Sequence, residues 1–367
     1  MSETLWRSSV KKLDPYIPGK AIEEVKRELG LEEIIRLASN ENPFGPSPKA
    51  VETMQRVILD GHLYPDASCF ELRQKLGTIQ GIEPDQYIIG NGADNIISLV
   101  IAAYVNSGDE VVYCTPTFSE YRRNTLLMEG VPVEVATTED HSFDLEAMLE
   151  AITDKTKLVI VCNPNNPTGT IVEGEKLRSF LKQLPKHVIA VLDEAYIEFV
   201  NQEKYFTGVE YLKEGCSLIA IRTFSKLYGL AGLRVGYAIT TKELMIPLQA
   251  VREPFACNRV SQAGAIASLE DEAHLNKVLS ENRTEMLRLI KEFQALGYEV
   301  KESHTNFLFI NMLQDTTKLA GDLLCRGLII RPCAAWGLPT YARISIGTAE
   351  QNDRLIGILK EISIHTV

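Results

Sequence analysis

Two side chains, a carboxylate and an amine, each follow an apolar run typical of a buried strand. Asp193 comes directly after the run 188–192, and Lys226 comes shortly after the run 217–221. Pyridoxal phosphate chemistry needs such a pair, because the amine forms a Schiff base with the aldehyde and the carboxylate keeps the pyridine nitrogen protonated. The pair therefore predicts a catalytic site at the ends of two strands.

Small polar residues and glycines surround Lys226. Thr223 and Ser225 precede it, and the mostly uncharged, glycine-rich stretch 227–234 follows it and ends in Arg234. An amine in such surroundings is partly desolvated, which lowers its pKa and favours the neutral nucleophile. The two hydroxyls and the guanidinium predict contacts to one phosphate. A lysine is more often a surface residue, and that interpretation stays open for Lys226 taken alone.

The string Gly90-Asn91-Gly92-Ala93-Asp94 follows another strand-like run and opens a predicted helix. Glycines let a ligand approach the backbone closely, and a helix N-terminus attracts an anion. Because Lys226 and Arg234 are expected nearby, we interpret this string as part of a phosphate site. The alternative is a tight turn with a helix cap.

Two more segments place polar or aromatic residues at strand ends. The turn Asn-Pro-Asn-Asn-Pro-Thr-Gly at 163–169 contains Asn166, which we expect beside the phenolic oxygen of the cofactor, with Tyr196 as a second hydrogen-bond donor. Phe118 follows the run 110–114 and can stack on the pyridine ring. The simpler alternatives are a structural turn and a buried core phenylalanine.

The elements that position these residues are short apolar runs alternating with helical patterns. The runs are 87–89, 110–113, 131–135, 157–162, 187–192, 217–221 and 235–239, and helix candidates include 94–105 and 173–184. Strands without polar alternation are buried on both faces, as in a parallel or mixed sheet between helices. In such α/β sheets ligands bind at the carboxyl ends of the strands.

The pattern changes after residue 265. A long helix is predicted over 276–296, ended by Gly297, and is followed by strands 307–310, 328–330 and 342–346 and helices 317–326 and 349–361. This order suits a smaller α+β domain. We expect an N-terminal arm that joins in part the small domain (1–45), a large cofactor-binding domain (46–265) and a small C-terminal domain (266–367).

Composition excludes several functional classes. The net charge of −11 and the lack of a long basic run argue against nucleic-acid binding. No apolar stretch approaches the roughly 18 residues of a membrane helix, and the first residues do not resemble a signal peptide. Seven scattered cysteines suit the reduced cytosol, so we expect a cytoplasmic protein. The six histidines lack metal-ligand spacing, so no metal is expected.

The motif series as a whole resembles the fold-type I pyridoxal phosphate aminotransferases over nearly the full chain. It consists of Asn-Pro-Thr-Gly at 166–169, Asp193 with Tyr196, and Ser225-Lys226 with Arg234. Strings such as Ser-Asn-Glu-Asn-Pro at 39–43, Tyr-Pro-Asp at 64–66 and Ala-Arg-Ile-Ser-Ile-Gly-Thr at 342–348 most resemble the histidinol-phosphate aminotransferase family. The resemblance implies an α/β fold with a mostly parallel seven-stranded sheet between helices and a smaller α+β C-terminal domain.

The resemblance also implies a role for each matching residue. Lys226 would carry the cofactor and move the proton, and Asp193 would pair with the pyridine nitrogen. The other cofactor contacts would be Asn166 and Tyr196 at the phenolic oxygen, the Ala93 and Asp94 amides with Thr223, Ser225 and Arg234 at the phosphate, and Phe118 where the family often has Tyr. Tyr64 would reach the phosphate from a second subunit, which implies a homodimer. The substrate contacts would be Arg331, Arg343, Asn42 and, from the arm across the dimer, Tyr16.

The implied reaction exchanges an amino group between L-histidinol phosphate and 2-oxoglutarate, giving imidazole acetol phosphate and L-glutamate in histidine biosynthesis. An aromatic amino-acid aminotransferase remains an alternative, because Arg343 can take any α-carboxylate. A decarboxylase of a phosphorylated amino acid on the same fold is a second. A non-catalytic sensor of pyridoxal phosphate would need a DNA-binding domain, and no stretch before residue 40 is long or basic enough for one.

Overall fold

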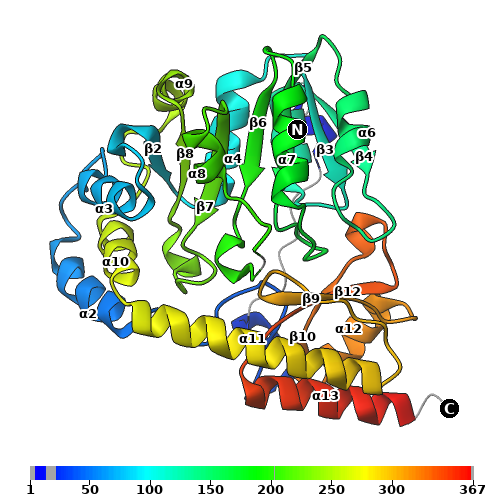
Figure 1. Cartoon of the computed structure of the whole chain (residues 1–367). Helices are drawn as coiled ribbons and strands as arrows, with labels where there is room; N and C mark the ends of the chain where they lie inside the picture. The colour runs from blue at the N-terminus through cyan, green and yellow to red at the C-terminus, as the bar shows by residue number, and fades with distance from the viewer. Residues whose placement is uncertain (1–4, 14–21, 202, 365–367) are drawn as a thin grey trace.

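A computed structural model describes residues 5–13, 22–201 and 203–364. In this part of the chain, seven strands form one sheet in the order β2-β8-β7-β6-β5-β3-β4 (Figure 1). They are β2 (Tyr87–Gly90), β3 (Glu110–Thr115), β4 (Val131–Ala136), β5 (Thr156–Cys162), β6 (Ile189–Asp193), β7 (Leu218–Thr223) and β8 (Gly236–Thr240). Because β8 alone runs against its neighbours, the predicted α/β fold with a mostly parallel seven-stranded sheet is confirmed.

The helices of the described residues connect and cover these strands. They are α1 (Ile22–Leu29), α2 (Pro48–Val57), α3 (Phe70–Gln80), α4 (Ala93–Tyr104), α5 (Glu120–Leu127), α6 (Leu145–Glu150), α7 (Gly174–Gln183), α8 (Gly208–Lys213), α9 (Lys242–Val251), α10 (Arg259–Leu269), α11 (Glu272–Ala295), α12 (Thr316–Leu324) and α13 (Ala349–Ile364). Both helix candidates of the large domain are present, as α4 and α7, with ends within one residue of those predicted.

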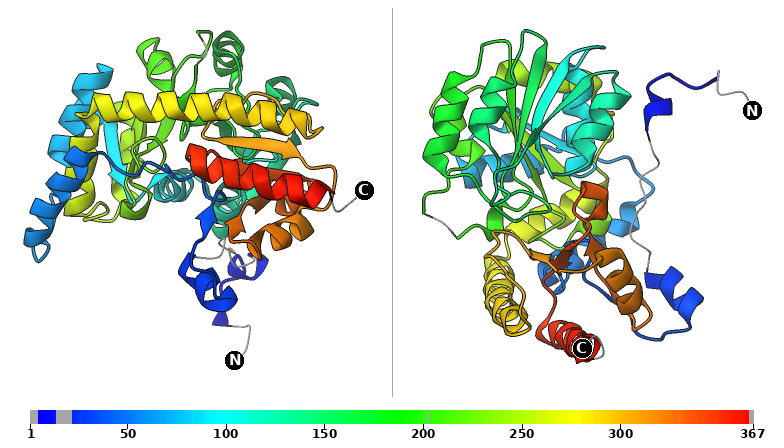
Figure 2. Two further views of the ribbon diagram at one scale, coloured as in Figure 1. Left: turned by 90° about the horizontal axis from the view of Figure 1, so that it is seen from below. Right: turned by 90° about the vertical axis from the view of Figure 1, so that its right-hand side faces the viewer.

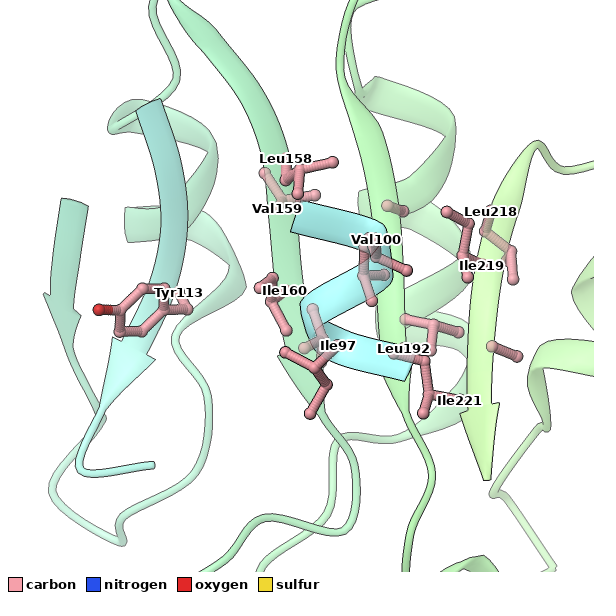
Figure 3. Close-up of a cluster of buried hydrophobic side chains, with 14 of the residues drawn as sticks. Ile97, Val100, Tyr113, Leu158, Val159, Ile160, Leu192, Leu218, Ile219 and Ile221 are labelled. Carbon is pink, nitrogen blue, oxygen red and sulfur yellow. The ribbon is translucent and has the colours of Figure 1, made fainter. Parts of the chain in front are cut away.

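The core of the large sheet explains the lack of alternation in its central strands. Helix α4 places Ile97 and Val100 against apolar side chains of β5, β6 and β7 (Figure 3), while α7 and α8 contribute Phe180 and Tyr211 to the same cluster. Every residue of β7 is buried. The prediction is wrong for β4, which lies at the sheet edge and is half exposed, because it has a strand neighbour on one side only.

A smaller three-stranded antiparallel sheet, in the order β11-β12-β9, forms a second core in the described C-terminal part. Its strands are β9 (Phe307–Asn311), β11 (Arg331–Pro332) and β12 (Tyr341–Ser345). Helices α11, α12 and α13 lie beneath it, on the side away from the large sheet (Figure 2). This arrangement leaves the other face of the small sheet toward the large one.

The predicted strand 328–330 is present as β10 (Leu328–Ile329), and a strand of the other small sheet follows directly after it. Strand β10 pairs in parallel with β1 (Ile35–Arg36), so residues of the N-terminal segment pair with a strand of the C-terminal part. Strand β11 then begins at Arg331 and pairs with β12. A short apolar run cannot reveal which strand it pairs with, because strand propensity is a local property.

The long helix α11 begins four residues earlier than predicted. Asp271 caps it by accepting a hydrogen bond from the His274 amide at 3.5 Å, and Gly297, at φ +88°, ends it as expected. The proposed boundary between residues 265 and 266 falls inside α10, which packs on α2 and α3 of the large domain. A division between α10 and α11 would keep that helix whole, and we propose it as the more natural boundary.

The parallel strands end at one edge of the large sheet, and β8 begins there. Gly236 of β8 lies between Gly90 of β2 and Thr223 of β7. A Cβ atom at Gly236 would lie 2.6 Å from the Ala93 amide nitrogen, at the first residue of α4. The missing side chain therefore lets the N-terminus of α4 approach the strand ends.

Replacing Gly236 by alanine should separate β8 from α4, because the added methyl group meets backbone atoms that cannot rotate away. We expect Gly236→Ala to lower the free energy of unfolding by about 1–3 kcal/mol, measured by urea denaturation. Gly357→Ala is the matched control: it lies in α13 with no atom within 4 Å of its Cβ position, so it should raise stability by about 0.5–1 kcal/mol. Equal stability of Gly236→Ala and the wild type would contradict the close approach.

Candidate active site

A cavity of about 280 Å³ opens where the strand ends of the large sheet face the small sheet. The predicted site residues that line it are Ala93, Asp94, Phe118, Asn166, Asp193, Tyr196, Thr223, Ser225, Lys226, Arg234, Arg331 and Arg343. Residues 38–41 of the N-terminal segment complete the wall. Residues from three distant parts of the chain therefore meet at the sheet edge where the sequence predicts the catalytic site.

Asp193, the last residue of β6, holds a buried carboxyl group at the base of this cavity. Its Oδ2 accepts a 2.6 Å hydrogen bond from the Tyr121 hydroxyl, and its Oδ1 accepts one of 3.1 Å from the Ala195 amide. Burial raises the pKa of the Asp193 carboxyl to about 6, and the two hydrogen bonds oppose that rise. Among the described residues no lysine or arginine pairs with it, so a cationic N–H group in the cavity would meet a well-placed carboxylate.

Lys226 lies in the turn after β7, beside the strand that carries Asp193. Its Nζ donates a 3.3 Å hydrogen bond to the Ser39 carbonyl oxygen and lies 5.4 Å from the centre of the Tyr196 ring. Burial, and secondly the positive charge of Arg343, lower the pKa of the Lys226 ammonium to about 8. The neutral, nucleophilic form of this amine is therefore far more populated near physiological pH than in an ordinary lysine, although the ammonium form still predominates.

A second end of the cavity is suited to an anion. The backbone of Ala93 and Asp94 opens α4 there, and the Arg234 Nη2 lies 2.9 Å from the Asp94 carboxylate. Gly92 has φ +90°, and a Cβ on it would lie 2.5 Å from the Arg234 guanidinium. The buried Thr223 hydroxyl lines the same end and accepts a 3.1 Å hydrogen bond from the Ser225 amide. Helix terminus, guanidinium and hydroxyls together form the kind of site that binds phosphate.

Tyr196 and Asn166 reach the cavity already oriented by other residues. Asn40 Nδ2 donates a 2.9 Å hydrogen bond to the Tyr196 hydroxyl oxygen. The hydroxyl hydrogen of Tyr196 can therefore be donated to a different acceptor, such as a ligand. Burial raises the pKa of the Tyr196 phenol, which keeps that hydrogen in place. Asn166 accepts from Arg343 Nη1 at 2.5 Å through its carbonyl oxygen, which leaves its amide N–H groups as the donors for a ligand.

The two arginines of the small sheet stand directly opposite each other. Arg331 of β11 and Arg343 of β12 are paired in register, so their side chains share one face, the face toward the cavity. Like charges placed opposite each other repel, and in the described part of the chain no carboxylate pairs with Arg331. An anionic ligand between the two guanidiniums would relieve that repulsion.

The lining or supporting residues that were not predicted from the sequence include Asn40, Tyr121, Cys162 and Trp336. Asn40 stands in the quoted string 39–43, and its φ of +54° is typical of a constrained turn. Tyr121 lies one helical turn after Phe118, a spacing that could have suggested a shared location. Trp336 follows the predicted Arg331 by five residues and is one of only two tryptophans in the chain.

Two predicted residues, Tyr64 and Asn42, are described by the structure and do not line this cavity. Tyr64 is 78% exposed and stacks on Phe255 with ring centres 4.6 Å apart. The Asn42 amide instead donates to the Leu227 carbonyl oxygen at 2.7 Å and so supports the residue after Lys226. Tyr16 lies outside the described residues. The substrate roles of Asn42 and Tyr16 therefore remain predictions.

Within residues 5–13, 22–201 and 203–364, no three His, Cys, Asp or Glu side chains gather as metal ligands would. None of the helices in these ranges has the length and apolar character needed to cross a bilayer.

Comparisons with known proteins agree with this geometry. Residues 32–359 match the family model described as aminotransferase class I and II. The histidinol-phosphate aminotransferase of Moorella thermoacetica is 44% identical over 97% of this chain and 92% of its own, and that of Caldicellulosiruptor saccharolyticus is 39% identical over 98% and 100%. The structure of the Sinorhizobium meliloti histidinol-phosphate aminotransferase in complex with pyridoxal-5′-phosphate has a TM-score of 0.90 at 26% identity, covering 100% of this chain and 99% of that one.

The surroundings of Lys226 predict an unusual pH dependence for its amine. In the cofactor-free chain, brief labelling with acetic anhydride should modify Lys226 with a midpoint near pH 8, because the reactive neutral form appears as pH rises through its pKa. An ordinary lysine is half neutral only near pH 10.4. Peptide mass spectrometry would follow the exposed Lys277 in the same sample as a comparison.

The Arg343→Met variant should move the midpoint for Lys226 upward, because it removes a positive charge that disfavours the ammonium form. A wild-type midpoint above pH 10, or no movement in the variant, would contradict the electrostatic picture of the cavity.

Proposed function

The chain belongs to the class I and II aminotransferase family, and we propose that it transfers the amino group of L-histidinol phosphate to 2-oxoglutarate. The products are imidazole acetol phosphate and L-glutamate, and the step belongs to histidine biosynthesis. The observation that carries this proposal is the arginine pair facing the cavity, in a chain 44% identical over 97% of its length to a histidinol-phosphate aminotransferase.

The arginine pair suits both halves of the exchange. Histidinol phosphate brings a phosphate monoester, whereas glutamate brings two carboxylates. Guanidinium groups bind either anion through paired hydrogen bonds, so Arg331 and Arg343 need not be replaced between the two half-reactions. A planar carboxylate and a tetrahedral phosphate can then use the same positive face.

The residues around the cavity fit pyridoxal phosphate, which we propose as the cofactor. The α4 N-terminus, Thr223, Ser225 and Arg234 would hold its phosphate. Asp193, buried and without a cationic partner among the described residues, would accept a hydrogen bond from its protonated ring nitrogen. Asn166 and Tyr196 would donate to its phenolic oxygen, and Phe118 would stack on the ring without the hydroxyl that a tyrosine would add.

Bound pyridoxal phosphate would supply an aldehyde for the amino group and a ring that accepts the electron pair released at the substrate α-carbon. Lys226 Nζ would accept the α-proton of the amino donor in one half-reaction and deliver a proton to the α-carbon of the keto acceptor in the other. Its lowered pKa suits both directions, since the amine can hold or release a proton near neutral pH. Asp193 would stabilise the positive charge on the ring nitrogen through both half-reactions.

We also propose that the enzyme works as a homodimer in the cytosol. Tyr64 is exposed and does not line the cavity of its own chain. It stacks on the exposed Phe255, and the apolar side chains exposed near it in the sequence include Ile58, Leu59, Leu63 and Phe70. A second copy covering this face would bury them and could bring Tyr64 to the other subunit's cofactor. The seven cysteines are free, which suits a reducing compartment.

The function is tested by single half-reactions of the yellow holoenzyme. Histidinol phosphate should bleach the visible absorbance and release imidazole acetol phosphate, whereas phenylalanine should react at least tenfold more slowly at equal concentration. Faster reaction with phenylalanine would favour an aromatic aminotransferase. Release of carbon dioxide from a phosphorylated amino acid without amino transfer would favour a decarboxylase.

Changes at Asp193 and Lys226 should affect different steps. Asp193→Asn should retain the cofactor through the phosphate contacts but lower kcat by about 10²–10³-fold, because the ring nitrogen loses its charged partner. Lys226→Ala should abolish turnover and the yellow absorbance together. Asp322→Asn, a change at an exposed carboxylate of α12, is the control and should leave both unchanged. A kcat for Asp193→Asn within threefold of the wild type would refute its role.

Tyr64→Phe should weaken cofactor retention although Tyr64 does not line the cavity of its own chain. Loss of one hydrogen bond to a charged phosphate predicts roughly tenfold faster cofactor release, measured by dialysis and absorbance. Tyr298→Phe, in the small-domain core, is the matched control. Sedimentation should give the mass of two 40.9 kDa chains. A single-chain mass, or unchanged release in Tyr64→Phe, would contradict the shared site.

A further inference from the structure

Trp336 lies in the cavity wall with its orientation restrained at both ends of the residue. It ends the short 3₁₀ turn Ala334–Trp336 after β11, and its amide donates to the Cys333 carbonyl oxygen at 2.9 Å. Its indole Nε1 donates a 2.6 Å hydrogen bond to the Thr117 carbonyl oxygen, in the loop after β3 of the large sheet. The side chain therefore spans from the small sheet to the large one.

This hydrogen bond decides what the indole can offer a ligand. Nε1 is the only hydrogen-bond donor of a tryptophan side chain, and the Thr117 carbonyl oxygen occupies it. What remains for the cavity is a flat apolar surface. The guanidinium carbons of Arg331 and Arg343 each lie 5.9 Å from the ring centre, so this surface stands next to both anion-binding groups.

The arginines and Phe118 are already matched to other parts of the ligands. The arginines suit the phosphate or carboxylate, and Phe118, next to Thr117, is expected on the cofactor ring. The part of histidinol phosphate left without a partner is its planar imidazole. Aromatic rings attract one another in stacked or edge-on arrangements beyond the area they bury.

We propose that Trp336 is a specificity-determining residue whose indole packs against the planar side chain of the amino donor. This inference rests on the proposed function, because it takes histidinol phosphate as the donor. Glutamate, the product of the second half-reaction, has no ring and gains little from this surface. Trp336 thus favours one of the two substrates that share the arginine pair.

The contact predicts a particular kinetic pattern. The imidazole ring does not change during the transfer, so its packing stabilises the bound substrate and the transition state equally. Losing it should raise KM for histidinol phosphate and leave kcat nearly unchanged. A residue that only kept the two sheets together would instead alter both substrates and kcat as well.

Two substitutions separate the ring from its hydrogen bond. Trp336→Phe keeps an aromatic surface and removes Nε1, whereas Trp336→Leu removes both. In the holoenzyme we expect Trp336→Leu to raise KM for histidinol phosphate roughly tenfold, with KM for glutamate and kcat within twofold of the wild type. For Trp336→Phe, the KM values for both donors should stay within about threefold of the wild-type values. An equal rise in KM for the two donors in Trp336→Leu, or an equal rise in KM in the two variants, would overturn the inference.

A second measurement does not depend on how well the leucine variant folds. The chain has two tryptophans, and Trp6 is 60% exposed, so a Trp6→Phe holoenzyme reports fluorescence from Trp336 alone. The unreactive 3-(imidazol-4-yl)propyl phosphate should change that fluorescence, whereas propyl phosphate, which binds the same arginines without a ring, should change it far less. Equal changes would overturn the inference.

Failure of the proposed function gives a different result. In that case the wild-type holoenzyme would not transfer the amino group of histidinol phosphate at all. A wild type that turns over histidinol phosphate, together with a Trp336→Leu variant of unchanged KM, would reject the role of Trp336 alone.

Discussion

A carboxyl group buried at the end of the central strand β6 constrains the rest of this cavity. Asp193 lies where burial disfavours its charge, and among the described residues the Tyr121 hydroxyl and the Ala195 amide stabilise the ionised form. A buried charge of this kind is stable only with a partner of opposite sign. A ligand that carries a positive N–H group would supply such a partner, and the neighbouring strand places the amine of Lys226 at the same opening.

The two sheets are connected through the residues expected to bind ligands. Arg343 of the small sheet bonds Asn166 of the large one, Trp336 bonds Thr117, and Asn40 holds Tyr196 while also bonding Ser345 of β12. An anion that moved the Arg343 guanidinium would therefore also act on Asn166, the proposed neighbour of the cofactor's phenolic oxygen. Substrate binding and cofactor electronics would then share a single hydrogen-bonded chain, without any long path through the core.

Much of the fold could be predicted because its signals are local. All seven runs of the large domain form the strands of one sheet, since apolar β-branched segments bounded by turns have few other ways to be buried. The predictions were less accurate where neighbours decide the outcome. Strand β4 is half exposed because it is an edge. The run 328–330 does form a strand, β10, but its pairing with β1 of the N-terminal segment could not be predicted from the run itself.

The same distinction applies to the site. The sequence by itself determined which side chains stand at strand ends, because a carboxylate or lysine after an apolar run is a local feature. Only the tertiary structure decided which partners orient them. Tyr121 meets Asp193 across 72 residues, Asn40 meets Tyr196 across 156, and Trp336 meets Thr117 across 219. Such contacts depend on the order and register of strands, which hydrophobic periodicity does not encode.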